Sequence, residues 1–456
     1  MEKKIIEKIK LIVGKENVLE SIEERVCYSY DATFQRGIPG LVAFPGNTAE
    51  VSEIIKLANK EKFPVFPRGA GTGLSGGSIP QDIGLALVLT RMNKIKEISQ
   101  EDLLAVIEPG VVTGFFQEAV EKQGLFYPPD PASLKTCTMG GNVAENAGGP
   151  RGFKYGVTKD YVLGLEVVTP LGDIMRTGGR TVKNVTGYDL TRLLTGSEGT
   201  LGIITEITLR LLSKPKEKRT ALIVFDCIDM AVGAVTALIQ QGVIPATLEL
   251  MDQITINCVE NHMRMGLPLD AEAVLLIEVD GSYRQVQYDI GTVEDICGYY
   301  KCREIRVAAK EEEQENLWKA RRAVSSAIVQ LSPTKISEDA TVPRSKIPEM
   351  VSRLRDIAAK YHLIIPVFGH AGDGNLHPNI LTDKNDRNEM ECVEKAVGEI
   401  FSVALELGGT LSGEHGIGLM KKPYLQWELR EEGLKYLKAI KSAVDPNNIL
   451  NPGKIV

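Results

Sequence analysis

The 456-residue sequence lacks several features that would place it in particular classes of protein. No run of residues approaches the roughly 18 consecutive apolar residues of a membrane-spanning helix. The net charge of -7 at pH 7 argues against nucleic acid as the main partner, because phosphate binding needs a basic surface. A local anion pocket stays compatible with an acidic chain.

The cysteines also lack the patterns that would indicate a disulfide framework or an iron–sulfur cluster. Seven cysteines are spread along the chain, an odd number without an even framework, which is typical of a reducing compartment. No two of them form a C-x-x-C pair, and the closest two are Cys297 and Cys302. The sequence therefore argues against an iron–sulfur cluster within this chain.

The N-terminus lacks the apolar core of a secretory signal. Residues 1–13 interrupt apolar positions with charges at helical spacing, which predicts an amphipathic surface helix. We therefore expect a cytoplasmic protein, with peripheral docking on a membrane as an alternative. The length exceeds what one core fills, so two or three domains are expected.

The most informative stretch is Gly369–Pro378, in which two of the five histidines flank a turn sequence. If Asp373 and Gly374 are the two central residues of a tight turn, His370 and His377 lie directly opposite each other. Cross-strand partners have Cβ atoms about 4.5–5.5 Å apart, so the imidazoles would share a metal ion or frame a small polar ligand. Two alternatives are open here: histidines bonded only to backbone, and a structural zinc clip.

Three segments of the N-terminal half are rich in glycine and small residues: Pro67–Ser78, Pro128–Pro150 and Gly196–Gly202. The first matches G-x-G-x-x-G letter for letter, but a strand is expected after it where a Rossmann site requires a helix, so we reject that site. Its backbone N–H groups can still converge on an anion, to which Arg68 adds a charge. A mobile surface loop is the alternative. Three such loops predict one extended cofactor that is touched at several places.

Periodicity predicts the regular elements. Helices are expected over residues 47–62, 115–122, 230–240, 254–262, 285–296, 311–329, 345–360 and 388–407. Strands are expected over residues 63–66, 84–89, 103–108, 163–169, 173–176, 203–212, 222–225, 247–250, 274–279 and 304–307. The alternation after the predicted linker Ser213–Arg219 indicates an α+β sheet domain with helices on one face.

Five segments, in order along essentially the whole chain, resemble the FAD-dependent D-2-hydroxyacid dehydrogenases: Arg68–Gly77, Gly140–Gly149, His370–His377, Gly413–Gly416 and Asp445–Gly453. This family includes D-lactate dehydrogenases and the flavin subunit of bacterial glycolate oxidase, and it has the vanillyl-alcohol-oxidase type of fold. The resemblance implies an α+β fold with a two-part FAD-binding domain over residues 1–215. It also implies a ferredoxin-like cap domain over 216–410 and a C-terminal segment, 411–456, that packs on the FAD domain and completes the active site.

The resemblance further implies which residues contact FAD, with the first glycine-rich loop holding the pyrophosphate. No histidine precedes His262, so the FAD is expected to be non-covalent unless a tyrosine or cysteine tethers it. The implied contacts are Pro67, Arg68, Gly69, Ala70, Gly71, Thr72, Gly73, Leu74, Ser75, Gly76, Pro129, Asp130, Ser133, Met139, Gly140, Gly141, Asn142, Asn146, Ala147, Gly148, Glu198, Gly199, Gly202 and Ile203.

By the same resemblance, His370, His377 and Glu414 match the ligands of a divalent metal, which would be zinc, iron or manganese. Two histidines and one glutamate leave coordination positions open for substrate, as catalytic sites do. A Lewis acid on the substrate hydroxyl would lower its pKa and stabilise the developing alkoxide.

Three further residues match catalytic positions of the family. His415 matches the residue that accepts the hydroxyl proton, which a neutral imidazole can do near physiological pH. Arg321 matches an arginine whose forked guanidinium binds the substrate carboxylate. Lys335 matches a second carboxylate-binding residue, although its spacing to the following proline departs from the family pattern. Taken without the resemblance, Arg321 would be a surface helix charge, and Glu414-His415 a capped turn.

The resemblance implies oxidation of a small D-2-hydroxy acid by hydride transfer to FAD, with D-lactate placed ahead of glycolate. Electrons would pass to an electron-transfer flavoprotein, an iron–sulfur subunit or a quinone, because nothing in the chain resembles an NAD site. Two alternatives belong to other classes. One is a non-redox transferase like alkyl-glycerone-phosphate synthase, and the other is a flavin-carrying electron-transfer subunit that has lost catalysis.

Overall fold

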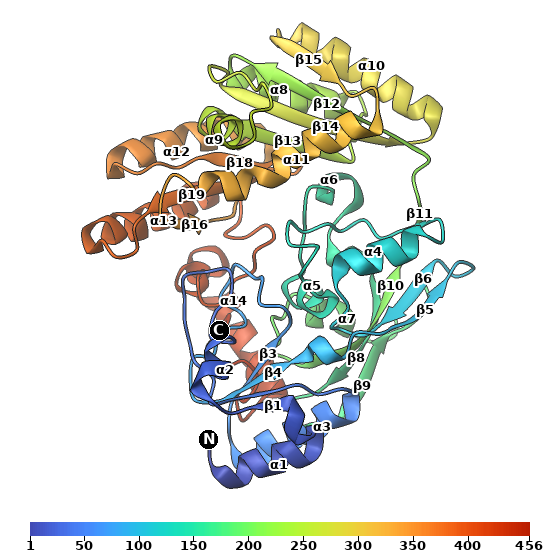
Figure 1. Ribbon diagram of the computed structural model, residues 1–456, viewed down its shortest axis with the longest axis vertical. Coiled ribbons are helices and arrows are strands. Elements are labelled where there is room, and N and C mark those ends of the chain that lie inside the picture. The colour runs from blue at the N-terminus through green and yellow to red at the C-terminus, as the bar shows by residue number, and fades with distance from the viewer. The chain divides into compact units, whose positions relative to one another are not determined.

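The computed structural model describes residues 1–456, which form two compact units (Figure 1). Unit 1 comprises Met1–Gly148, Val157–Lys214 and Glu414–Val456, and unit 2 comprises Gly149–Gly156 and Pro215–Gly413. Each unit is therefore assembled from segments that are distant in sequence.

Unit 1 contains most of the short elements. Its helices are α1 (Lys3–Val13), α2 (Ile22–Val26), α3 (Thr48–Glu61), α4 (Thr113–Glu121), α5 (Met139–Glu145), α7 (Leu190–Leu194) and α14 (Leu425–Val444), with the 3₁₀ helices η1 (Lys15–Asn17), η2 (Leu89–Arg91), η3 (Thr158–Asp160) and η5 (Lys422–Tyr424). Its strands are β1 (Val18–Leu19), β2 (Leu41–Ala43), β3 (Val65–Arg68), β4 (Leu85–Val88), β5 (Ile95–Ser99), β6 (Leu104–Ile107), β7 (Leu125–Phe126), β8 (Val162–Val168), β9 (Ile174–Gly178), β10 (Ile203–Arg210) and β11 (Leu212–Ser213).

Unit 2 contains longer elements. Its helices are α6 (Gly152–Tyr155), α8 (Ile228–Gln240), α9 (Gln253–Met263), α10 (Tyr283–Tyr299), α11 (Glu311–Ile328), α12 (Ile347–Tyr361) and α13 (Arg387–Glu406), with the 3₁₀ helix η4 (Arg344–Lys346). Its strands are β12 (Glu217–Phe225), β13 (Thr247–Asp252), β14 (Ala273–Gly281), β15 (Glu304–Val307), β16 (Thr334–Ser337), β17 (Ala340–Thr341), β18 (Val367–His370) and β19 (Asn375–Thr382).

The first sheet of unit 1 has the strand order β1-β2-β4-β3, with β2, β4 and β3 parallel. Helices α1 and α3 share a core with it, and Figure 1 shows both in blue beside β1. Helix α3 confirms the sequence prediction, because the Asn47 side chain accepts the Glu50 N–H, and Val51, Ile54 and Ile55 are buried at helical spacing.

The second sheet of unit 1 is antiparallel, with the order β5-β6-β10-β8-β9, and α4 and α5 contribute to its core. Helix α5 corrects the sequence prediction, which treated residues 140–149 as a loop. Thr138 caps this helix at the Gly141 N–H, and Asn146 ends it at a φ of 54°. Gly140 is needed inside the helix because a Cβ there would lie 2.5 Å from Cβ of Pro109.

The last residues of the chain pack within unit 1. Ile449 and Leu450 are buried in the core of the first sheet, and the Val65 N–H donates to the Ile449 carbonyl. The Asn451 side chain donates to the carbonyls of Gly77 and Glu198 at 2.9 and 2.7 Å. The C-terminal segment therefore holds two of the glycine-rich loops together.

Unit 2 is built on one sheet with the order β15-β12-β14-β13-β18-β19-β16, all antiparallel, with β17 also paired to β19. Leu222 and Val224 of β12 pack with α9 and α11, whereas α8 and α10 contact β12 and β14 without joining that core. The buried strand residues alternate between the faces, so helices cover both. The prediction of helices on one face is wrong, because it used helix order alone.

Two further boundaries differ from the sequence prediction. The predicted linker Ser213–Arg219 is shorter, because Ser213 pairs in β11 and Glu217 begins β12 opposite Gly281. No sequence pattern indicates that Gly149–Gly156 joins unit 2. It does so through Asp280, which accepts hydrogen bonds from Lys154 and Tyr155 at 2.5 and 2.7 Å.

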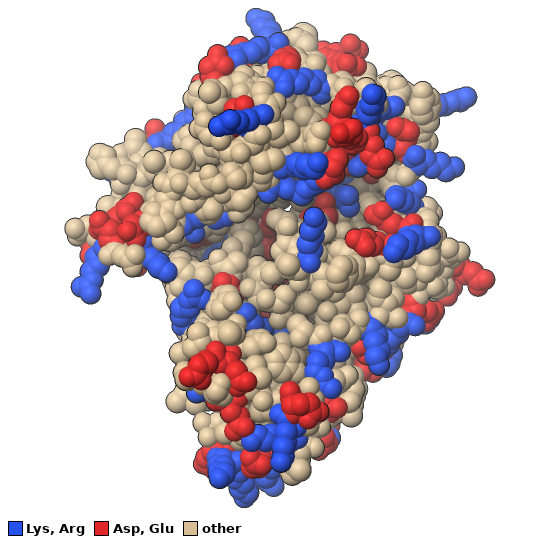
Figure 2. Space-filling view, viewed as in Figure 1, with Lys and Arg blue, Asp and Glu red and all other residues tan.

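No helix combines the length and the apolar composition needed to cross a membrane. On the face shown in Figure 2, basic and acidic side chains are interspersed and no extended basic area is seen.

Asp252, the last residue of β13, provides a test of how helix α9 is capped in unit 2. Its buried carboxylate caps α9 by accepting the Thr255 N–H at 2.9 Å. Burial raises the pKa of Asp252 from 3.8 to about 6. Because the folded pKa is raised, the stability that this group contributes is fully present below pH 3.8 and is lost as the pH rises through 6.

We therefore predict that Asp252→Asn, which keeps a capping acceptor, does not lose stability as the pH rises through the pKa of Asp252. The free energy of unfolding of the variant minus that of the wild type should increase by roughly 3 kcal/mol between pH 4 and pH 8. Urea unfolding in a Trp427→Phe background measures it, because the only remaining tryptophan, Trp318, lies on α11 of unit 2. A difference that stays constant with pH would contradict the raised pKa.

Candidate active site

One cavity in unit 1 gathers segments from all three glycine-rich regions. It contains about 1360 Å³ of empty space, including its mouth open to solvent. The expected cofactor contacts that line it are Pro67, Arg68, Gly69, Ala70, Gly71, Thr72, Gly73, Leu74, Ser133, Gly140, Gly141, Asn142, Ala147, Gly148, Glu198, Gly199, Gly202 and Ile203.

Some expected contacts lie outside the lining. They are Ser75, Gly76, Pro129, Asp130, Met139 and Asn146. Met139 is completely buried in the core of the second sheet, because α5 turns it away from the cavity. Ser75 instead donates to the Glu145 carboxyl at 3.1 Å.

The sequence analysis missed several lining residues. They are Gly77, Ser78, Leu89, Pro109, Pro131, Ala132, Cys137, Thr138, Ala144, Glu145 and Ile204. Gly77, Ser78, Pro131 and Ala132 continue segments that were already singled out. Cys137, Thr138, Ala144 and Glu145 also lie within the segment Pro128–Pro150, whereas no local pattern marks Leu89, Pro109 and Ile204.

The loop after β3 is tight enough to require glycine. Gly71 has a φ of 71°, and a Cβ there would lie 2.0 Å from Nη2 of Arg68. A Cβ at Gly69 would lie 2.2 Å from Oγ1 of Thr138. The backbone amides of this loop are therefore not screened by side chains, which is what close approach of a ligand needs.

Arg68 places a buried positive charge beside this loop. The residue is 5% exposed, its Nη1 donates to Oγ of Ser78 at 3.2 Å, and it forms no ion pair with a carboxylate. Burial lowers its pKa, which Asp31 partly offsets. Buried charges are normally paired, so this guanidinium fits an anionic ligand such as a phosphate group.

The carboxyl groups of Glu198 and Glu145 form another part of the cavity wall. Glu198 accepts the N–H groups of Ile417 and Gly418, both at 2.7 Å, and burial raises its pKa to about 7. Burial and Glu198 raise the pKa of Glu145 well above its ordinary value. Oε2 of Glu145 is buried and has no hydrogen-bond partner in the protein. The raised pKa favours the protonated form of Glu145, which would donate a hydrogen bond to a ligand in the cavity.

In unit 2 the histidine hairpin differs from its prediction. β18 ends at His370 and β19 begins at Asn375, so the turn has four residues, and His370 pairs with Asn375 while His377 pairs with Phe368. The prediction of a two-residue turn with the histidines directly opposite is wrong. Gly374, at a φ of 87°, lies against the Val342 carbonyl, a tertiary contact that local turn rules do not include.

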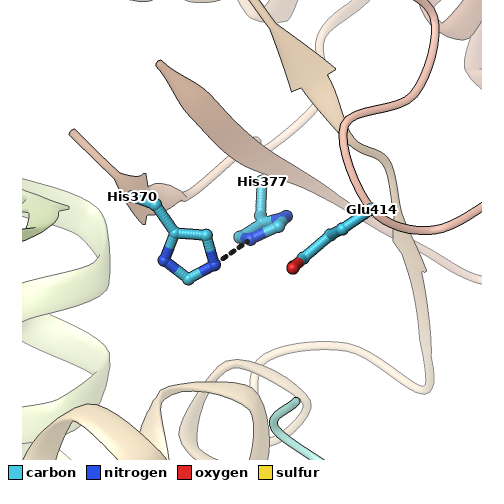
Figure 3. Close-up of side chains that lie close together, drawn as sticks. All are labelled: His370, His377 and Glu414. Carbon is cyan, nitrogen blue, oxygen red and sulfur yellow. Dashed lines mark hydrogen bonds between the residues drawn. The ribbon is translucent and has the colours of Figure 1, made fainter. Parts of the chain in front are cut away.

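The two histidines nevertheless converge. Opposite and alternate residues of paired strands share a face, so His370 and His377 are diagonal neighbours on one face of the sheet. Both side chains are buried, and their Nε2 atoms lie 3.4 Å apart (Figure 3). Two imidazole nitrogens at this distance can bind one cation.

Glu249 fixes the orientation of His370. Its carboxylate oxygen Oε1 lies 2.6 Å from Nδ1 of His370 and accepts a hydrogen bond from the Nδ1–H group, which leaves the lone pair of the neutral ring on Nε2. Burial raises the pKa of Glu249, but Arg321 and His370 lower it further, so the carboxylate is ionised. The sequence analysis missed Glu249, because the strand TLELMD carries no motif that marks it.

Glu414 follows Gly413, the last residue of unit 2, and lines the cavity of unit 1 together with His415. Its carboxylate and the imidazoles of His370 and His377 offer ligand atoms that all lie within 4.8 Å of one another (Figure 3). The expected metal ligands are thus brought together.

The structure also brings Arg321 and Lys335 onto the face of the sheet that carries the histidines. The Arg321 guanidinium donates to Glu249 and lies 4.7 Å from the centre of the Phe368 ring. Its side chain is only 11% exposed, so it is not a surface helix charge. Lys335 donates to Oγ of Ser325 at 2.6 Å, one turn after Arg321 on α11, and burial lowers its pKa.

Comparisons with known proteins agree with these features. The FAD binding domain model matches residues 39–178, and the model of the C-terminal domain of FAD linked oxidases matches residues 214–455. Glycolate oxidase subunit GlcD of Bacillus subtilis is 51% identical over 99% of this chain and 97% of its own length. D-lactate dehydrogenase of Anaerostipes hadrus is 36% identical over 99% of this chain and 97% of its own length.

Solved structures confirm the expected fold. P-cresol methylhydroxylase with substrate bound has a TM-score of 0.84, at 19% identity, and covers 99% of this chain and 96% of that chain. Alkyldihydroxyacetonephosphate synthase has a TM-score of 0.79, at 18% identity, and covers 100% of this chain and 85% of that chain. Likeness at this identity shows the vanillyl-alcohol-oxidase type of fold and not the activity.

The similarity extends over nearly the full length of this chain and of each of the two relatives. One family model matches the N-terminal half of this chain, and the other matches the C-terminal half. The FAD-binding model includes the loop after β3, and the second model includes the histidine hairpin. The chain therefore belongs to the FAD-linked oxidases, in the group of glycolate oxidase subunit GlcD and the D-lactate dehydrogenases, and is an FAD-dependent oxidoreductase.

Proposed function

We propose that this protein oxidises a small 2-hydroxy acid, using FAD in the cavity of unit 1 and a divalent metal bound by His370, His377 and Glu414. The observation that carries the proposal is the convergence of the two Nε2 atoms at 3.4 Å, with Nδ1 of His370 held by Glu249. A pair of buried histidines that only stabilised the fold would not need a buried carboxylate to hold Nδ1 of one ring so that its Nε2 faces the Nε2 of the other.

The cavity residues fit FAD. The glycine loop after β3 exposes backbone amides, the buried Arg68 has no carboxylate partner, and the raised pKa of Glu145 favours the form that donates to a neutral acceptor. When bound, FAD would supply the acceptor for the hydride that leaves Cα of the substrate. The protein's part is to hold the cofactor and keep water from the reacting atoms.

The donor set also fits a divalent metal. Two imidazoles and one carboxylate suit zinc, iron or manganese, and three ligands leave positions open for substrate. When bound, such a metal would polarise the substrate hydroxyl. Zinc would suffice for this, because the electrons pass to flavin.

The remaining residues bind and deprotonate the substrate. Arg321 uses Nε and Nη2 on Glu249, which leaves Nη1 and the outer edge of the guanidinium for the substrate carboxylate. Lys335 adds a second cation on the same face. His415 in the cavity wall takes the proton of the substrate hydroxyl as a neutral imidazole.

Identity to the named relatives bears on the substrate. The 51% identical relative is named a glycolate oxidase subunit, and the D-lactate dehydrogenase is 36% identical, so we place glycolate ahead of D-lactate. This order reverses the one expected from the sequence. The name of a subunit, and the lack of any C-x-x-C pair, also support an external electron acceptor: an electron-transfer flavoprotein, an iron–sulfur subunit or a quinone.

The central test is anaerobic absorption spectroscopy of the purified protein. We expect glycolate or D-lactate to bleach the flavin bands, because both place a hydroxyl on the carbon next to a carboxylate. L-lactate and D-2-hydroxyglutarate serve as tests of handedness and size. A flavin spectrum that none of the four acids bleaches would sink the assignment and favour a transferase or a carrier.

A second prediction concerns the cofactor loop. Gly71→Ala should raise the FAD dissociation constant about tenfold, because αL strain of about 1–2 kcal/mol and the displaced Arg68 both disturb the loop. FAD titration into flavin-depleted protein measures it. Gly179→Ala is the matched control, since that glycine has ordinary φ and open space around it. Equal FAD binding by both variants would contradict the assigned role of the loop.

A third prediction concerns the metal. His377→Ala should keep the flavin and lose both the metal and at least 100-fold in turnover, because two ligands bind a cation far more weakly than three. Elemental analysis and flavin absorbance measure the two groups separately. His362→Ala is the control, as this residue only ends α12. Retained metal with full activity would refute the ligand assignment.

A further inference from the structure

We propose that Glu249 is a positioning residue that joins two parts of the active site, because one carboxylate orients both the metal ligand His370 and the substrate-binding Arg321. This inference rests on the proposed function of those two residues. Neither motif nor spacing marks Glu249, and it touches neither substrate nor metal in its proposed role.

The geometry divides the two oxygens of the carboxylate. Oε1 of Glu249 lies 2.6 Å from Nδ1 of His370, and Oε2 lies 2.6 Å from Nε and 2.5 Å from Nη2 of Arg321. The Glu249 side chain is completely buried. Each partner therefore occupies its own oxygen, and water does not compete for either.

Strand register places the carboxylate where it can reach both partners. Glu249 on β13 is directly opposite His370 on β18, so their side chains leave the same face of the sheet. Arg321 comes from α11, which covers that face, and its guanidinium lies over Phe368, the residue two before His370. The Glu249 carboxylate therefore links the sheet to helix α11.

Each contact has a separate chemical consequence. The bond to Nδ1 keeps the His370 proton away from Nε2, which leaves a lone pair for a metal and raises ligand basicity. The bond to Nε and Nη2 turns the other edge of the Arg321 guanidinium outward, which sets the direction from which a carboxylate can approach. Loss of the Glu249 charge should therefore weaken metal binding and substrate binding together.

The experiment uses Glu249→Gln in the FAD-loaded protein after removal of metal by a chelator. Isothermal titration with Zn²⁺ should show affinity reduced 10–100-fold, the usual effect of losing such a partner. Anaerobic flavin bleaching by glycolate or D-lactate, whichever the wild type accepts, should show KM raised about tenfold. Glu249→Asp, which keeps the charge but is shorter, gives a second variant with an intermediate Zn²⁺ affinity if the amide fails to fold.

Glu278→Gln is the matched control. Glu278 is buried on the adjacent strand β14. It accepts hydrogen bonds from Trp318 and Thr220, neither of which is a proposed metal ligand or substrate-binding residue. It should leave Zn²⁺ affinity and KM unchanged. Equal loss in the two variants would mean general destabilisation and would overturn the positioning role.

A double variant separates the two effects. Because Glu249 acts on KM through Arg321, the variant with both Arg321→Met and Glu249→Gln should have the KM of Arg321→Met alone. The Zn²⁺ defect of Glu249→Gln should persist in it. Additive KM effects would overturn the link to Arg321.

The outcome also distinguishes this inference from the proposed function. If His377→Ala loses Zn²⁺ while Glu249→Gln binds it as the wild type does, the metal site stands and the role of Glu249 is refuted. If His377→Ala itself binds Zn²⁺ normally, the proposed metal site fails, and the inference fails with it.

Discussion

The buried carboxylate of Glu249 is the interaction on which the candidate catalytic face of unit 2 depends. A buried anion must be compensated, and here the compensation comes from His370 on a neighbouring strand and Arg321 on a covering helix. Removing either partner would leave charge uncompensated in the interior. The chemistry of the face and the packing of helix on sheet are therefore not separable.

In unit 1 the corresponding buried charge is positive. Arg68 is buried without a carboxylate, next to a loop whose glycines leave the backbone exposed. Asn451, from the end of the chain, bridges Gly77 and Glu198 and so fixes two loops that are far apart in sequence. A buried guanidinium without a carboxylate partner, beside exposed backbone amides, is preorganised for a phosphate-containing cofactor.

Local patterns predicted much of this. The cap at Asn47 and the helical spacing after it located α3, and the glycine-rich segments located most of the cavity lining. Two of the errors arise from tertiary contacts. The helix found where a loop was expected packs against Pro109 at Gly140, and the four-residue turn packs against the Val342 carbonyl at Gly374; a Cβ at either glycine would clash. Neither partner lies near the motif that it changes.

The sequence by itself determined the family, the expectation of FAD, and the candidate ligands His370 and His377, because the motifs that resemble the family are local stretches that are matched by residue type and order. Only the tertiary structure decided that these histidines converge diagonally, that Arg321 is buried, and that the Glu249 carboxylate contacts both His370 and Arg321. The reason is physical. Strand register and helix-on-sheet packing join residues more than 70 positions apart, and no local pattern encodes which buried carboxylate will meet which cation.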